Sequence, residues 1–77
     1  MSDYEHIVIS AVRYAIGRTT YMVGITVNYV LKEIEEHKLS EECLDVIAEE
    51  IRHTKNLGMD FDKEQWLKLL DKIEEVI

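Results

Sequence analysis

Residues 11–29 read AVRYAIGRTTYMVGITVNY, and this stretch decides how the chain folds. It lies in the most apolar part of the 77-residue sequence, yet it holds two of the three arginines and three of the four tyrosines. Gly17 is typical of the residue that follows a helix, and Thr19 or Thr20 is a good N-cap for the next one. The stretch therefore predicts two helices that meet near Gly17.

The first of these helices has a clear start. Ser2 and Glu5 have the spacing of a capping box, so we expect a helix from Ser2 to about Gly17. Most positions around this helix are apolar, at Tyr4, Ile7, Val8, Ile9, Ala11, Val12, Tyr14, Ala15 and Ile16.

The second helix is expected to run from Thr19 or Thr20 to about Glu36. Its apolar residues form two separate stripes, one of Val23, Val27, Val30, Leu31 and Ile34 and the other of Tyr21, Met22, Ile25 and Tyr29. A helix that is apolar nearly all round is buried on nearly all sides. The many β-branched residues also permit a strand here, although their spacing favours two helical stripes.

Two further helices are indicated downstream. Ser40 is a good N-cap for a third helix, which we expect Asn56 and Gly58 to end. Asp62 is the expected N-cap of a fourth helix, with Gln65 completing a capping box and Phe61 and Trp66 in the positions of a hydrophobic staple. The expected inner faces are Cys43, Leu44, Ile47, Ala48 and Ile51 on the third helix and Trp66, Leu69, Leu70, Ile73, Val76 and Ile77 on the fourth.

The fold class that follows is all-α, a compact bundle of about four short helices in a single helical domain over residues 1–77. A core of this size is marginal, and one cysteine excludes an intrachain disulfide, so we expect the bundle to assemble as a homo-oligomer. The first two helices carry more apolar surface than the single apolar stripes of the third and fourth helices can cover. We therefore predict an oligomer interface at Tyr21, Met22, Ile25 and Tyr29, with Tyr14 beside it.

Charge is distributed unevenly along the chain, whose net charge is −7. Residues 1–32 carry two acids and three bases, whereas residues 33–77 carry fourteen acids and six bases. Such an acidic protein is a poor candidate for direct nucleic-acid binding. The longest uncharged run, 19–31, is too short to cross a bilayer. We expect a cytoplasmic protein that needs no membrane, cofactor or metal.

The junction of the first two helices is the best candidate ligand site. If the second helix starts there, its free N–H groups, a threonine hydroxyl and the Arg18 guanidinium suit a phosphate or carboxylate. Arg13 could add a second cation, and Tyr14 and Tyr21 could stack on a base. The candidate ligand-binding residues are Arg13, Tyr14, Arg18, Thr19, Thr20 and Tyr21. The plainer interpretation makes Arg18 a solvated cation and pairs Arg13 with an acid from the second half.

No catalytic signature is present, and we do not expect an enzyme. Glu50 and His53 have the spacing of a di-iron helix, but a single copy favours a surface pair. Cys43 lacks a companion base and is expected in the core. An acidic surface is expected from Glu33, Glu36, Glu41, Glu42, Asp45, Glu49, Glu50, Glu74 and Glu75. It is either a solvated face or a mimic of nucleic acid that blocks a positively charged channel, with Glu41, Glu42, Asp45 and Glu49 as its centre.

The sequence from Ala11 to Tyr21 resembles a family of short proteins of tailed phages and prophages. These carry Ala-Val-Arg-Tyr-Ala-Leu-Gly-Arg, then Thr and Tyr, then an apolar helix. They often end with a Gly, acid and Trp pattern similar to Gly58, Asp60, Asp62 and Trp66 here, while Ile16 departs from the usual leucine. The resemblance implies a phage protein, and the analogy with other small phage proteins suggests counter-defence.

Together these features predict a non-enzymatic counter-defence protein that acts by binding. In the favoured form it is a sponge that sequesters a nucleotide-type immune signal at an oligomer interface. The alternatives are an acidic inhibitor of a host nucleic-acid-targeting effector, similar to an anti-CRISPR protein, and a structural or regulatory phage module.

Overall fold

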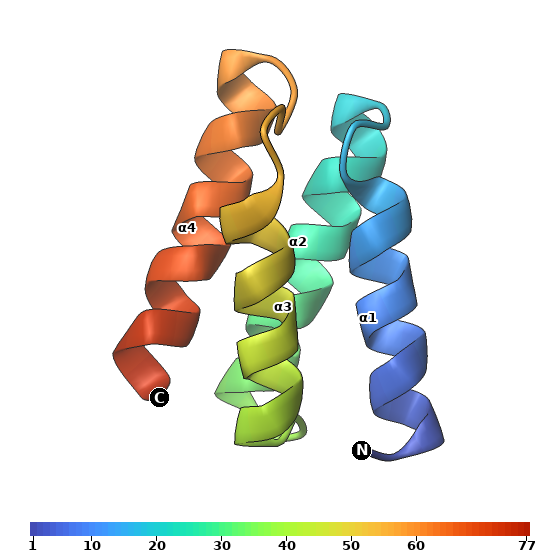
Figure 1. Ribbon diagram of the computed structural model, residues 1–77, viewed down its shortest axis with the longest axis vertical. Coiled ribbons are helices and arrows are strands. Elements are labelled where there is room, and N and C mark those ends of the chain that lie inside the picture. The colour runs from blue at the N-terminus through green and yellow to red at the C-terminus, as the bar shows by residue number, and fades with distance from the viewer.

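Four α-helices joined by short connections make up the computed structural model, which describes residues 1–77 (Figure 1). The helices are α1 (Asp3–Ala15), α2 (Thr20–Glu35), α3 (Glu41–His53) and α4 (Asp60–Val76). There are no strands, so the expected all-helical fold is confirmed and the strand alternative for the second apolar stretch is wrong. None of the helices combines the length and apolar character that crossing a lipid bilayer requires.

The helices run alternately up and down the bundle (Figure 1). α1 packs against α2 and α3, and α4 packs against the same two helices, so α1 and α4 lie at opposite corners. As a result α1 and α3 are neighbours that start at one end of the bundle, while α2 and α4 start at the other (Figure 1). The core between them contains 17 buried apolar residues, among which Trp66 is the largest fully buried side chain.

Three of the four predicted helix starts are confirmed. The hydroxyls of Ser2, Thr19 and Ser40 each accept a backbone hydrogen bond at the first turn of α1, α2 and α3. Gly17 ends the first helix region with a φ of 83°, in the left-handed conformation that glycine adopts without strain. With Thr19 as the cap, Arg18 lies ahead of α2 and Thr20 is the first residue of the helix.

The start of α4 differs from the prediction. Its N-cap is Met59, whose side chain makes no capping bond, so the helix begins before Asp62. Asp62 therefore lies inside the first turn, where it is buried, and the capping box with Gln65 does not form. Phe61 is 57% exposed while Trp66 is fully buried, which excludes the expected staple. An acidic side chain is favoured electrostatically at any position of the first turn of a helix. The sequence around Asp62 was therefore compatible with Asp62 as the cap of α4 and with Asp62 inside its first turn.

Two smaller expectations are also wrong. α3 ends at His53 with Thr54 as its C-cap, before Asn56 and Gly58, which lie in the connection to α4. Val76 and Ile77 are 47% and 45% exposed and do not join the inner face of α4, because the helix extends past the core at this end.

Glu5 ties the starts of α1 and α3 together. Its Oε1 accepts from the backbone N–H of Ser2 at 3.2 Å, and its Oε2 accepts from the backbone N–H of Ser40 at 2.6 Å. The bond from Ser40 is the main reason that the pKa of Glu5 is lowered to about 2. One carboxylate thus satisfies N–H groups at two helix starts whose positive dipole ends lie side by side.

Glu33 is a second buried carboxylate, not part of the acidic surface where the sequence predicted it. It is 4% exposed in α2 and accepts a hydrogen bond from the hydroxyl of Tyr4 in α1. That hydroxyl is also bonded to the hydroxyl of Tyr29, and Lys38 lies 3.9 Å from the other oxygen of Glu33. These partners explain why a carboxylate is tolerated beside the core.

The Glu5 contacts predict an acid-dependent stability. The pKa of Glu5 is lower in the folded protein than in the unfolded chain, so its hydrogen bonds stabilise the fold above pH 4.5. That stabilisation is lost as the pH falls toward about 2. We expect Glu5→Gln to lower the free energy of unfolding at neutral pH and to flatten its dependence over this acid range. Urea unfolding at a series of pH values measures both effects.

The matched control is Glu64→Gln, which removes an exposed carboxylate of α4 that makes no hydrogen bond to another helix. Its pH profile should follow that of the unmodified protein. Parallel profiles for Glu5→Gln and the unmodified protein would contradict the double-capping role of Glu5.

Candidate functional site

The junction between α1 and α2 contains the candidate ligand residues, but several of its polar groups already have hydrogen-bond partners within the protein. Thr19 accepts a hydrogen bond from the backbone N–H of Met22 at 3.3 Å and thereby caps α2. The first turn of α2 contains no acid of its own. An anion from elsewhere in the chain or from a ligand would therefore be favoured at its positive end.

Asp62 of α4 provides a carboxylate at this helix start. Its Oδ2 accepts from the hydroxyl of Thr20, the first residue of α2, over a long 3.3 Å. Asp62 is only 4% exposed, and its Oδ1 has no hydrogen-bond partner. An external phosphate at the α2 start would meet this negative charge, so the helix start itself is a poor anion site. The sequence suggested that Asp62 caps α4, so its contact with Thr20 was not expected. The lack of an acid in the first turn of α2 was a signal that a carboxylate from another helix could lie there.

Arg18 and Tyr14 are brought together at the surface of the junction. The guanidinium carbon of Arg18 lies 4.5 Å from the centre of the Tyr14 ring, a cation–π arrangement. The Nε–H of Arg18 donates to the backbone oxygen of Tyr14 at 3.2 Å, which leaves both terminal amino groups without a protein partner. Arg18 is the only arginine that makes no ion pair with a carboxylate.

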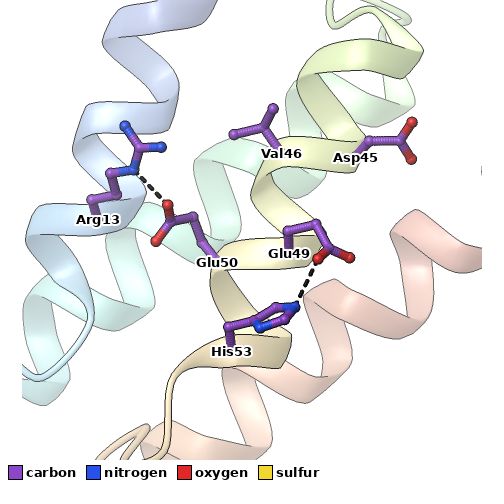
Figure 2. A pocket seen from close by; sticks show the side chains of 6 residues that line it. All are labelled: Arg13, Asp45, Val46, Glu49, Glu50 and His53. Carbon is purple, nitrogen blue, oxygen red and sulfur yellow. Dashed lines mark hydrogen bonds and ion pairs between the residues drawn. The ribbon is translucent and has the colours of Figure 1, made fainter.

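Arg13 faces a different helix. Its Nε lies 2.6 Å from Oε1 of Glu50 in α3, as the plainer sequence interpretation expected (Figure 2). The pair borders an open groove of about 480 Å³ between α1 and α3. Because Arg13 points toward α3 and is paired, it does not share a pocket with Arg18. Of the six candidate ligand residues, only Tyr14 and Arg18 are joined to each other by a hydrogen bond or a cation–π contact.

The groove beside Arg13 is acidic. Asp45, Glu49 and Glu50 line it, and Glu49 is paired in turn with His53 at 2.8 Å (Figure 2). Glu50 and His53 lie at the surface, but they are bonded to different partners and do not form the surface pair that their spacing suggested. No group of three His, Cys, Asp or Glu side chains has an arrangement suited to a metal ion.

Some acidic residues of α3 are paired with positively charged groups, and others are not. Glu42 lies 3.5 Å from the Met1 amino group, and Glu49 is bonded to Arg52 and His53. Glu41 and Asp45 are exposed and make no hydrogen bond or ion pair, and Asp45 points away from the Arg13–Glu50 pair (Figure 2). The free negative charge of this face is therefore concentrated in the first half of α3.

Apolar side chains cover the side of α1 and α2 that faces away from the core. We call this surface the outer face; it consists of Tyr4, Ile7, Ala11, Tyr14, Tyr21, Met22, Ile25 and Tyr29. Tyr21 is 76% exposed and Ile7 is 66% exposed, so the face is open in the single protomer. A patch of this kind typically marks an interaction site. It contains all the residues expected at an oligomer interface.

Cys43 is fully buried, in agreement with its expected place in the core. Burial raises the pKa of its thiol to about 11, so it is not a thiolate nucleophile at neutral pH.

Comparison of the chain with protein-family models, with curated proteins and with solved structures finds no match.

The Thr20–Asp62 contact predicts a measurable cost. Thr20→Val keeps the shape of the side chain but leaves both oxygens of a buried carboxylate unpaired, so we expect it to reduce the free energy of unfolding by about 1–3 kcal/mol. Thr20→Ser retains the hydroxyl and is the matched control. Chemical unfolding of both variants measures the difference, and equal stability of the two would show that the hydroxyl contributes nothing.

Proposed function

We propose that this protein is a non-enzymatic counter-defence protein of a phage and acts by binding. In its favoured form it is an oligomer that sequesters a nucleotide-type immune signal at the interface between protomers. The phage origin rests on the resemblance of Ala11–Tyr21 to short phage and prophage proteins. The binding role rests on the contact between Arg18 and Tyr14 at the edge of the apolar outer face.

Arg18 has the properties that a phosphate ligand requires. Its Nε–H is used by the backbone of Tyr14, which holds the guanidinium in place, and its two terminal amino groups remain available. A guanidinium with two free amino groups can bind two phosphate oxygens at once. Tyr21, 76% exposed and three residues further along, offers a flat ring for a base. Arg13 is expected to contribute less, because Glu50 already neutralises it.

The proposal predicts that binding depends on Arg18. We expect the protein to bind at least one member of a panel of cyclic di- and oligonucleotides in titration calorimetry. Replacing Arg18 by Gln removes charge-assisted hydrogen bonds of about 1.5–3 kcal/mol, which corresponds to roughly 10- to 150-fold weaker binding.

The matched control for this titration is Arg52→Gln, because Arg52 is bonded to Glu49 and Glu74 on another side of the bundle. It should bind like the unmodified protein, and Arg13→Gln should have a smaller effect than Arg18→Gln. Equal binding by the Arg18→Gln variant and the unmodified protein would refute the proposed site.

A second candidate function is favoured by the acidic groove between α1 and α3. Here the protein would inhibit a host nucleic-acid-targeting effector by presenting carboxylates to its basic channel. Asp45 lines this groove and Glu41 lies four residues before it on α3; neither makes an internal pair, so their charge is available to a partner. Such a complex would form quickly and weaken as the ionic strength rises. A structural or regulatory phage role remains the third alternative, for which the ligand is the protein's own copy.

The inhibitor proposal predicts a loss of inhibition on charge reversal. We expect Glu41→Lys, Glu42→Lys, Asp45→Lys and Glu49→Lys together to abolish inhibition of a sensitive effector in a cleavage assay. Reversal of Glu64 and Glu75 on α4 changes the net charge in the same direction and serves as the control. Inhibition that survives the four α3 substitutions and does not change with salt would exclude this candidate.

A further inference from the structure

α1 carries two apolar seams on different sides. One faces the core and is formed by Val8, Ile9, Val12 and Ala15. The other consists of Tyr4, Ile7, Ala11 and Tyr14, which are all exposed. Their spacing of three and four residues is that of the a and d positions of a coiled coil, the pattern by which one helix packs lengthwise on another.

α2 repeats this arrangement next to it. Met22, Ile25 and Tyr29 have the same spacing of three and four residues and lie outside the core stripe of Val23, Val27 and Val30. The hydrogen bond between the hydroxyls of Tyr4 and Tyr29 joins the two outer seams into one surface. Since α1 and α2 are antiparallel neighbours, this surface has the form of one half of a four-helix bundle (Figure 1).

Two of the four tyrosines of this surface, Tyr4 and Tyr29, have hydroxyls that are already hydrogen-bonded within the protein. The hydroxyl of Tyr4 is bonded to both Tyr29 and the buried carboxylate of Glu33. Covering the rings of Tyr4 and Tyr29 would therefore leave neither hydroxyl without a partner, so at these two residues the usual cost of burying a polar group is avoided. The same bonds fix the orientation of these two rings before any partner arrives, which lowers the entropy cost of association.

The charges at the two ends of the α1 seam indicate which partner fits. Asp3 lies at its beginning, is exposed and makes no ion pair, while Arg18 lies beyond its end and makes none either. A second copy in antiparallel orientation would bring each Asp3 toward the Arg18 of its partner. A parallel copy would instead bring like charges together, which disfavours that orientation.

We infer that a second copy of this chain covers the outer face, forming a two-fold dimer in which α1 and α2 of each protomer pack on those of the other. This inference rests on the oligomer of the proposed function and names its surface and orientation. A two-fold contact uses the same surface on both copies and covers both seams at once, so the assembly closes as a dimer. In this dimer the Asp3 carboxylate of the second copy lies near Arg18, so an anionic ligand would compete with that carboxylate for the guanidinium.

The first test is sedimentation velocity of the full chain over a range of concentrations in the absence of ligand. We expect a dimer for the unmodified protein and at least a hundredfold weaker association for Ile7→Glu and for Ile25→Glu, because each variant would bury a charge at the seam. Ile7 and Ile25 are 66% and 50% exposed, so both variants should keep the helical content of the unmodified protein. Leu67→Glu is the control, since Leu67 is an exposed apolar residue of α4, which does not contact α1.

The orientation is tested by exchanging the end charges. Asp3→Lys and Arg18→Glu should each weaken the dimer several-fold, and the double variant should recover the affinity to within about twofold, since it restores opposite charges across both ends. A monomer at all concentrations, or Ile7→Glu and Ile25→Glu variants as dimeric as the unmodified protein, would overturn the inference. A double variant weaker than either single one would overturn the antiparallel orientation.

The same variants separate this inference from the proposed nucleotide site. A stable dimer that binds none of the cyclic nucleotides would leave the inference standing and refute the sponge. An Ile25→Glu monomer that still binds a nucleotide as tightly as the unmodified protein would place the ligand within one protomer. A monomeric unmodified protein that binds a nucleotide would refute the dimer alone.

Discussion

The fold depends on placing two positive helix ends side by side at each end of the bundle. α1 and α3 start together at one end, and α2 and α4 start together at the other. At each end, a carboxylate from the first turn of one helix accepts a hydrogen bond from the start of the neighbouring helix. Glu5 of α1 binds the N-cap of α3, and Asp62 of α4 binds the first residue of α2. The two carboxylates thus have equivalent positions at opposite ends of the molecule, and each favours the parallel pairing of its two helices.

This arrangement also bears on where a ligand can be held. Since Asp62 occupies the start of α2, an anion would bind through Arg18 and the tyrosines at the surface, without direct use of the helix start. These groups border the outer face of α1 and α2, which α3 and α4 leave uncovered because they pack on the core stripes of the same helices. The proposed ligand site and the proposed dimer surface are therefore adjacent.

Much of the fold could be predicted from local signals. Ser2, Thr19 and Ser40 start their helices as expected because a cap depends on residues only a few positions away. Asp62 was misassigned because two acids near the start of α4 fit more than one register, and the choice depends on a contact with Thr20, 42 residues away. For the same reason the burial of Glu33 and the bond from Glu5 to Ser40 could not be inferred: their partners come from other helices. At the candidate site, the sequence indicated a possible ion pair for Arg13 but not its partner, and it did not indicate that Arg18 would stack on Tyr14.

Native mass spectrometry of the protein, purified gently from a bacterium with active defence systems, tests the central claim most directly. It reports the number of protomers and any bound small molecule in the same spectrum. The account predicts a dimer that carries a nucleotide-sized adduct, and the adduct should be lost on unfolding. A monomer without any adduct would contradict both the interface at the outer face and the ligand site beside it.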